Sequence, residues 1–168
     1  MIKASNALLV IVAFLTVASF SSCKKGKKTD TEPVVKGTVT ADIDGKASDF
    51  SKFALSYTGS VNGKDFTAVQ GDSDDGSTIG LTVFGTITVG KTYTGADQAI
   101  GTGPTLLYSV GDDDYLTDLY DPSVTITVTA VSSSSIKGTF SGSVTNIASG
   151  ANHGKKMVIT NGKFNVQR

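Results

Sequence analysis

The densest group of residues that could do chemistry lies between positions 108 and 121, where aspartates and tyrosines share one predicted loop. Neighbouring carboxylates can ligate a hard cation such as Ca²⁺, and exposed tyrosine rings beside carboxylates can hold a sugar or a peptide. Simpler explanations compete, because aspartate is a common turn residue and tyrosines can fill one end of a core. We expect no resident metal and no cofactor, and keep as possible ligand or cation contacts Tyr108, Asp112, Asp113, Asp114, Tyr115, Asp118, Tyr120 and Asp121.

A second acidic group, Asp72, Asp74 and Asp75, lies in the polar stretch from Gly71 to Ser77. An EF-hand loop needs a glutamate at its twelfth position. Counted from Asp72, that position is Val83. We therefore predict a solvated turn here and no calcium site.

The segment Gly85-Thr86-Ile87-Thr88-Val89-Gly90-Lys91-Thr92 fits the spacing of a phosphate-binding P-loop. A P-loop requires a helix that begins at its lysine, so that backbone N–H groups meet the phosphate. The residues after Lys91 have no helical period, and Thr-Ile-Thr-Val is typical of a strand. We predict that this segment binds no nucleotide.

Catalytic constellations are sparse in this chain. His153 is the only histidine, there is no G-x-S-x-G motif, and Glu32 is the only glutamate. General acid–base and nucleophilic catalysis draw on these residue types. We predict that the protein is not an enzyme.

Cys23 is the only cysteine, and it follows a segment with the pattern of an export signal. The mostly apolar run Ala7–Phe20 comes after Lys3 and ends in two serines, which is the arrangement of a signal peptide. As a helix the run would span about 21 Å, short of the roughly 30 Å core of a bilayer. Phe20-Ser21-Ser22-Cys23 resembles the lipobox of bacterial lipoprotein precursors, with Phe20 where leucine is usual. The resemblance implies removal of residues 1–22 and a diacylglyceryl group and an acyl chain, such as palmitate, on Cys23.

Residues 23–35 form a predicted tether that begins with Lys24, Lys25, Lys27 and Lys28. It is nearly devoid of apolar residues, so we expect it to be disordered. Its lysines can lie against anionic lipid head groups. From Pro33 onward the chain has ten basic and thirteen acidic residues and lacks the positive surface that nucleic acid requires.

Residues 36–168 have the length and pattern of one all-β domain. Apolar residues alternate with threonine and serine, and Asp44-Gly45 and Asn62-Gly63 are hairpin turn signals. Asn161-Gly162 is either a tight hairpin or a bulge in one long strand. Eight or so short strands predict an antiparallel β-sandwich, with a β-barrel as the alternative. The strands are expected around Thr38–Ile43, Phe53–Tyr57, Asp65–Gln70, Ile79–Val83, Val124–Val128, Ile136–Val144, Lys156–Thr160 and Lys163–Val166.

The C-terminal third carries a further resemblance. Ile136-Lys137-Gly138-Thr139-Phe140-Ser141-Gly142, followed by Ile159-Thr160-Asn161-Gly162-Lys163-Phe164-Asn165-Val166, is similar to the ending of many small lipoproteins from one large group of Gram-negative bacteria. That family is of unknown function, so the resemblance implies fold and location but no active site. In this group, surface export is associated with acidic residues after the lipidated cysteine, and here lysines take their place.

Together these patterns predict an envelope lipoprotein anchored to the outer membrane through Cys23 and facing the periplasm. We expect a non-catalytic binding or accessory module, whose ligand could be a glycan. The alternative is a structural subunit that binds another envelope protein.

Overall fold

The computed structural model describes residues 37–95, 103–118, 123–148 and 150–168. They belong to a unit that spans Val35–Arg168. The signal peptide, Cys23 and the tether up to residue 36 lie outside the described residues. The described residues form eleven strands and no helix: β1 Thr38–Ile43, β2 Lys46–Asp49, β3 Phe53–Val61, β4 Lys64–Asp72, β5 Thr78–Phe84, β6 Thr92–Thr94, β7 Thr105–Val110, β8 Asp113–Leu116, β9 Val124–Val131, β10 Ser135–Asn146 and β11 Lys156–Gln167.

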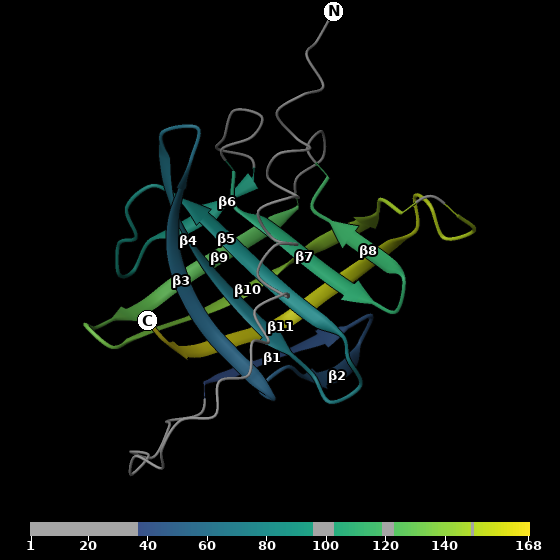
Figure 1. Cartoon of the computed structure of the whole chain (residues 1–168), viewed down its shortest axis with the longest axis horizontal. Coiled ribbons are helices and arrows are strands. Elements are labelled where there is room, and N and C mark those ends of the chain that lie inside the picture. Colours follow the sequence, from purple (N-terminus) through teal and green to yellow (C-terminus); the bar gives the residue numbers. More distant parts are fainter. Residues whose placement is uncertain (1–36, 96–102, 119–122, 149) are drawn as a thin grey trace, which may run out of the picture. The chain divides into compact units, whose positions relative to one another are not determined.

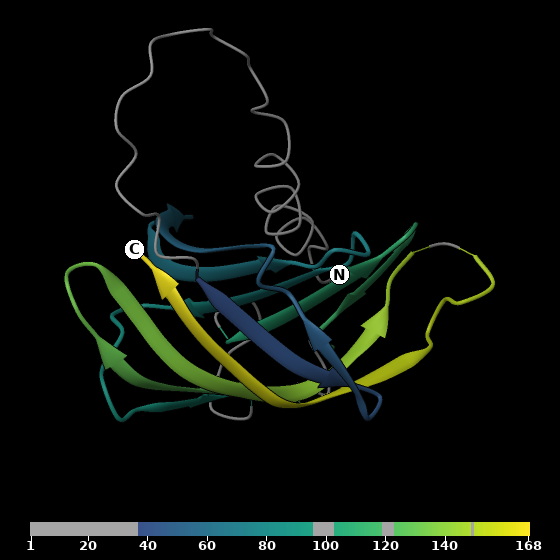
Figure 2. The same cartoon turned by 90° about the horizontal axis from the view of Figure 1, so that it is seen from below.

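The strands make two layers (Figures 1 and 2). Layer A has the order β6-β9-β10-β11-β1-β2, and layer B has the order β3-β4-β5-β7-β8. Neighbours within each layer are antiparallel. Period-two alternation gives each strand one apolar face, and both layers turn that face inward.

The layers join at two corners. At one corner Gln167 of β11 pairs with Leu55 of β3 in the parallel direction, and the Ser56 hydroxyl donates to the Gln167 carbonyl at 2.7 Å. At the other corner Tyr115 and Leu116 of β8 pair with the end of β10. The predicted all-β class is confirmed, as a sandwich whose layers close at both corners in the manner of a flattened barrel.

The turn signals act as predicted. Asp44 and Gly45 have φ of 48° and 80°, and Asn62 and Gly63 have φ of 51° and 73°. Positive φ at both central residues belongs to the two-residue turn whose twist matches that of paired strands. These turns join β1 to β2 and β3 to β4.

Asn161 resolves the alternative left open at the C-terminus. β11 runs without interruption from Lys156 to Gln167, and the pairing register shifts opposite Thr40–Asp42 and Phe140–Gly142. Asn161 has φ of 54°, and its side-chain amide donates to Asp42 Oδ2 at 2.7 Å. The segment is therefore a bulge in one long strand rather than a hairpin.

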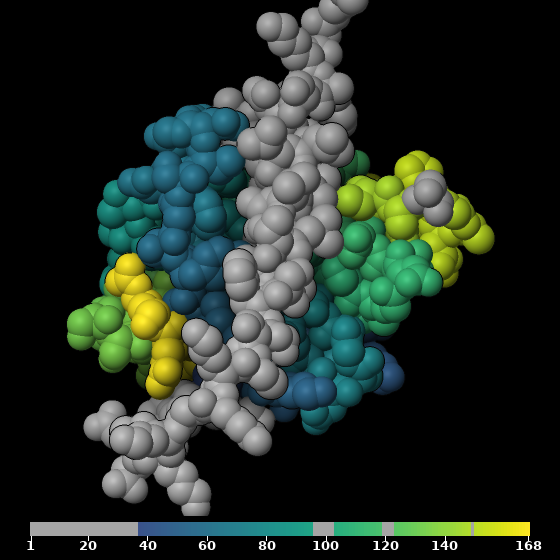
Figure 3. All heavy atoms as spheres, in the orientation of Figure 1, coloured from purple at the N-terminus to yellow at the C-terminus, as the bar shows by residue number. Residues whose placement is uncertain are grey.

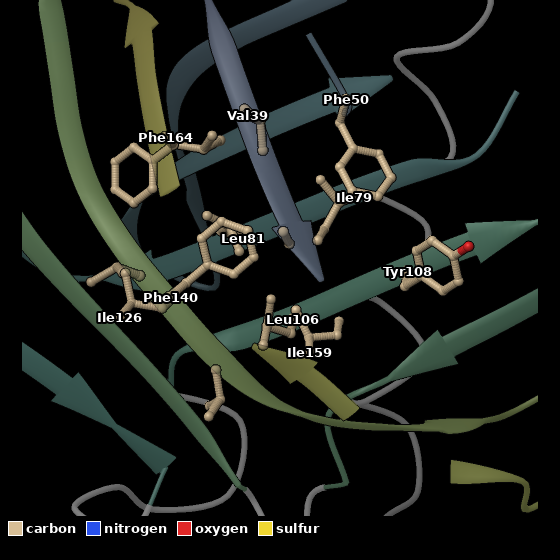
Figure 4. Close-up of a cluster of buried hydrophobic side chains, with 14 of the residues drawn as sticks. Val39, Phe50, Ile79, Leu81, Leu106, Tyr108, Ile126, Phe140, Ile159 and Phe164 are labelled. Carbon is tan, nitrogen blue, oxygen red and sulfur yellow. The ribbon is translucent and has the colours of Figure 1, made fainter. Parts of the chain in front are cut away.

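The core lies between the layers and is made of aliphatic and aromatic side chains from nearly every strand (Figure 4). Layer A contributes residues such as Val39, Ile126 and Ile159, and layer B contributes residues such as Leu81 and Leu106, all nearly inaccessible to solvent. Phe50, which precedes β3, is fully buried among them. Sequence alternation identifies most of these residues but not Phe50, which lies outside any strand.

Two phenylalanines cover two glycines in the centre of layer A. Gly138 of β10 faces Phe164 of β11, and Phe140 of β10 faces Gly162 of β11. A β-carbon on Gly138 would lie 2.4 Å from the Phe164 ring, and one on Gly162 would lie 2.6 Å from the Phe140 ring. Each ring thus fills the space that its partner strand leaves empty.

Candidate functional site

The aspartate-rich stretch is mostly a hairpin and not the loop that its composition predicted. β7 and β8 pair antiparallel across a turn at Gly111 and Asp112, with Gly111 at φ of 60°. Gly-Asp between two short apolar runs is a hairpin signal. That signal was present in the sequence, but the run of three aspartates obscured it because aspartate is depleted in strands.

Tyr108 and Tyr115 face each other across this hairpin and point into the core, in agreement with the simpler explanation that these tyrosines fill one end of the core. They are only 8 % and 2 % exposed, and their ring centroids lie 6.0 Å apart. The Phe50 ring packs edge-on against Tyr108 at 6.2 Å. Burial raises the pKa of Tyr108. Rings packed in this way fill one end of the core and offer no stacking surface to a sugar.

The aspartates of the hairpin bind their own protein. Asp113 accepts hydrogen bonds from the side-chain amides of Asn146 at 2.9 Å and Asn152 at 2.7 Å. Asp114 accepts one from the Ser109 hydroxyl at 2.6 Å. Adjacent strand residues point to opposite faces, so these two carboxylates do not converge on one ion.

The remaining members of this group do not complete a site. Asp112 is exposed on the turn, and Asp118 is partly exposed beyond β8. Tyr120 and Asp121 lie outside the described residues. Across the described ranges, no three His, Cys, Asp or Glu side chains stand close enough to hold a metal ion. Asp113 instead fastens β8 to β10 and to the loop after it, and Asp114 fastens β8 to β7.

The other acidic group is also divided among separate partners. β4 extends to Asp72, so the predicted loop begins two residues later than expected. Asp72 Oδ1 accepts hydrogen bonds from Gln70 and Thr78, and Asp74 lies 3.7 Å from the exposed ammonium of Lys52. These carboxylates stabilise a turn, as predicted.

Asp75 is the best-bonded carboxylate of this turn. It accepts hydrogen bonds from the Ser73 hydroxyl, from the Ser77 hydroxyl at 2.7 Å and from the Ser77 amide at 2.9 Å. These bonds, with that from Ser73 the largest contributor, lower the pKa of Asp75 from 3.8 to about 2. The sequence pattern Ser-x-Asp-x-Ser was the available signal for this arrangement.

The segment with P-loop spacing runs into strand β6 and not into a helix. Its backbone groups are occupied, since the Gly90 amide donates to the Val128 carbonyl at 2.8 Å and the Thr88 amide donates to the Tyr93 hydroxyl at 2.9 Å. The Lys91 ammonium lies 4.8 Å from the centre of the Tyr93 ring. This geometry has no helix N-terminus that could receive a phosphate.

No family model, curated protein or solved structure matches this chain. The functional interpretation therefore rests on the chain's own residues. Among the described residues, none forms a helix long and apolar enough to cross a membrane.

Neither His153 nor the space between the two layers forms a site with the acidic residues described above. His153 is exposed, with Nδ1 3.2 Å from the Ala148 carbonyl oxygen. Between the layers, an apolar cleft of about 10 Å³ is lined by residues of β4, β5, β9, β10 and β11. A space of this size holds at most one water, so this cleft cannot admit a ligand.

Proposed function

We propose that the protein is a lipoprotein anchored through Cys23, whose β domain is a non-catalytic binding or accessory module at the outer membrane, on its periplasmic side. The observation that carries the proposal is the segment Phe20-Ser21-Ser22-Cys23 directly after an apolar run. A thioether-linked diacylglycerol with an amide-linked acyl chain buries many methylenes at about 0.8 kcal/mol each, so such an anchor is effectively permanent.

The described domain supports a role other than catalysis. Its carboxylates accept hydrogen bonds from neighbouring side chains, and its one histidine stands alone on a loop. A catalytic site brings a base, a nucleophile or an acid together in a cleft. The clusters considered above lack that convergence, which favours binding through a surface.

Lipidation is tested by Cys23→Ala in the native host. Mass spectrometry of the mature wild-type protein should show a diacylated or triacylated N-terminal cysteine, and the variant should accumulate as full-length precursor. Protease added to intact cells should spare the protein and should digest it once the outer membrane is permeabilised. A mature chain that carries a free thiol would refute the anchor, and digestion on intact cells would refute the periplasmic orientation.

A further inference from the structure

The outer face of layer B is uncharged and mostly apolar over three successive rows of cross-strand neighbours. Layer B is turned toward the viewer in Figure 1, and Figure 3 shows the molecule from the same side. We call this outer face the apolar face, and its rows are Gly59–Phe66–Phe84, Tyr57–Ala68–Thr82–Thr105 and Leu55–Gln70–Gly80–Leu107–Leu116. Its large side chains are partly exposed, and none of its residues is charged. Charge returns in the rows on either side, with Lys64 at one end of the face and Asp72 and Asp114 at the other.

The outer face of layer A has the opposite character. Its side chains are mostly polar, and include Thr38, Thr40, Thr125, Thr127, Lys137, Thr139, Ser141, Lys163 and Asn165. A solvated sheet face is expected to look like this. The contrast indicates that the apolar face of layer B is built to meet a partner less polar than water.

The arrangement of its rings argues against a carbohydrate partner. Tyr57 and Phe66 meet at 86° with centroids 6.1 Å apart, and Phe66 and Phe84 meet at 61° and 6.2 Å. Sugar rings stack on the flat faces of aromatic rings, whereas these rings pack edge to face on each other. Neither ring pair is parallel, so the cluster does not form one flat stacking platform.

The extent of the face argues against a stable protein interface formed from free solution. The three rows hold twelve residues in all. With strands about 4.8 Å apart and rows about 6.8 Å apart, these twelve positions cover roughly 400 Å². A stable protein–protein interface takes about 800 Å² from each partner. A domain that is already held at a surface needs far less, because tethering supplies a high effective concentration.

The chain enters the domain beside this face. Gly37 packs on the backbone of Ala54 in β3, so closely that a β-carbon at Gly37 would lie 2.5 Å from the Ala54 carbonyl oxygen. Leu55 and Tyr57 of the same strand belong to the apolar face. Thirteen residues separate Gly37 from Cys23 and span at most about 45 Å. A lipid on Cys23 would thus keep the apolar face within reach of the bilayer.

We propose that the apolar face of layer B rests on the lipid–water interface of the membrane that holds the anchor. The proposal depends on the lipid anchor of the proposed function. The tyrosine and phenylalanine side chains enter the head-group boundary, and the charged row with Asp72 and Asp114 stays in water. The polar face of layer A then points away from the membrane.

The absence of tryptophan from the chain permits a direct test. Phe84→Trp places one fluorophore on the apolar face, and Thr139→Trp places one on the exposed face of layer A as a matched control. The full acylated proteins are reconstituted in phosphatidylethanolamine–phosphatidylglycerol vesicles with brominated acyl chains. Burial by about 5–10 Å should shift the emission of the Phe84→Trp protein to the blue and quench it by at least about half. The Thr139→Trp protein should show neither effect.

Adding Leu107→Lys to the Phe84→Trp protein should remove the quenching while circular dichroism remains unchanged. Ser141→Lys in the same background should leave the quenching intact. Equal quenching of both reporters would overturn the proposal. The proposal would also be overturned if the blue shift increased with the number of proteins per vesicle and brominated acyl chains caused no quenching. That result would show that the face binds a second copy of the chain. Flotation of the protein with the vesicles tests lipidation separately. A chain without a lipid anchor does not float with the vesicles. An anchored chain whose apolar face does not touch the bilayer floats, but the fluorescence of its Phe84→Trp reporter is not quenched by bromine.

Discussion

At the scale of single residues, the acidic side chains that looked most like ligands serve the turns that hold them. Asp113 accepts hydrogen bonds from two asparagine side-chain amides, and Asp75 accepts them from two serine hydroxyls and a backbone amide. A carboxylate that satisfies nearby donors stabilises a turn. In this domain, clustering of aspartates along the chain therefore reflects the demand of tight turns for acceptors.

Asp75→Asn tests this role through its pH dependence. Hydrogen bonds to the carboxylate hold its folded-state pKa at about 2, below the usual 3.8. A lowered pKa stabilises the fold above the unfolded-state pKa, and the contribution is lost as the pH falls through the folded-state value. The melting temperature of wild type should exceed that of Asp75→Asn near pH 5, and the two should converge as the pH approaches 2.

Ser77→Ala removes two of the hydroxyl bonds in this turn and is the matched companion variant. It should reproduce part of the loss near neutral pH, and the double variant should lose little more than Asp75→Asn alone. A melting-temperature difference that stays constant between about pH 5 and pH 2 would contradict the assignment.

At the scale of elements, the repeated pattern Gly-x-Phe on β10 and β11 is a packing device. Gly138 and Phe140 on one strand face Phe164 and Gly162 on the other. The two rings lie 6.5 Å apart and are tilted by 33°. Strong curvature of layer A (Figure 2) brings its concave face onto these rings, and only a glycine opposite each ring leaves room for it.

Gly138→Ala should be strongly destabilising. Its β-carbon would lie 2.3 Å from the Thr127 carbonyl oxygen and 2.4 Å from the Phe164 ring. We expect the free energy of unfolding, measured by chemical denaturation, to fall by at least about 1–3 kcal/mol. Thr139→Ala, at the next and exposed position, should change it by no more than about 0.5 kcal/mol. Similar values for the two variants would show that the ring does not need the glycine.

Most elements could be predicted from alternation and turn chemistry. β1 has the predicted bounds, and the Asp44-Gly45 and Asn62-Gly63 turns are where the sequence placed them. β2, β6, β7 and β8 were missed. β2, β6 and β8 have four or fewer residues, which give too short a period, and β7 has two adjacent leucines that break the alternation. Alternation also does not show that an apolar face points inward: Leu55 and Tyr57 share one face of β3, yet this face is the outer face of layer B. The apolar face was hidden from the sequence for that reason.

At the scale of the whole domain, few contacts join the two layers at their edges. The corner between β3 and β11 has one paired position and one side-chain bond, from Ser56 to the Gln167 carbonyl. The opposite corner has two paired positions. The buried core supplies the main attraction between the layers, and the corners fix their register.

Ser56→Ala should loosen the first corner without unfolding the domain. The Gln167 carbonyl would lose its donor, which costs about 1 kcal/mol. Hydrogen exchange should accelerate for amides near Leu55 and Gln167 and remain unchanged in β5. Ser60→Ala, at an exposed position of the same strand, should leave both stability and exchange unaltered. Faster exchange throughout layer B would contradict a local role for this bond.

β11 is the last of the described strands along the chain, yet it lies in the middle of layer A, between β10 and the first described strand, β1. Neither layer A nor the corner at Gln167 can be completed until the twelve residues of β11 have left the ribosome. Pairings between such distant parts of a chain form late because loop closure must come first. A nascent chain of this topology therefore keeps both layers open until β11 has been made.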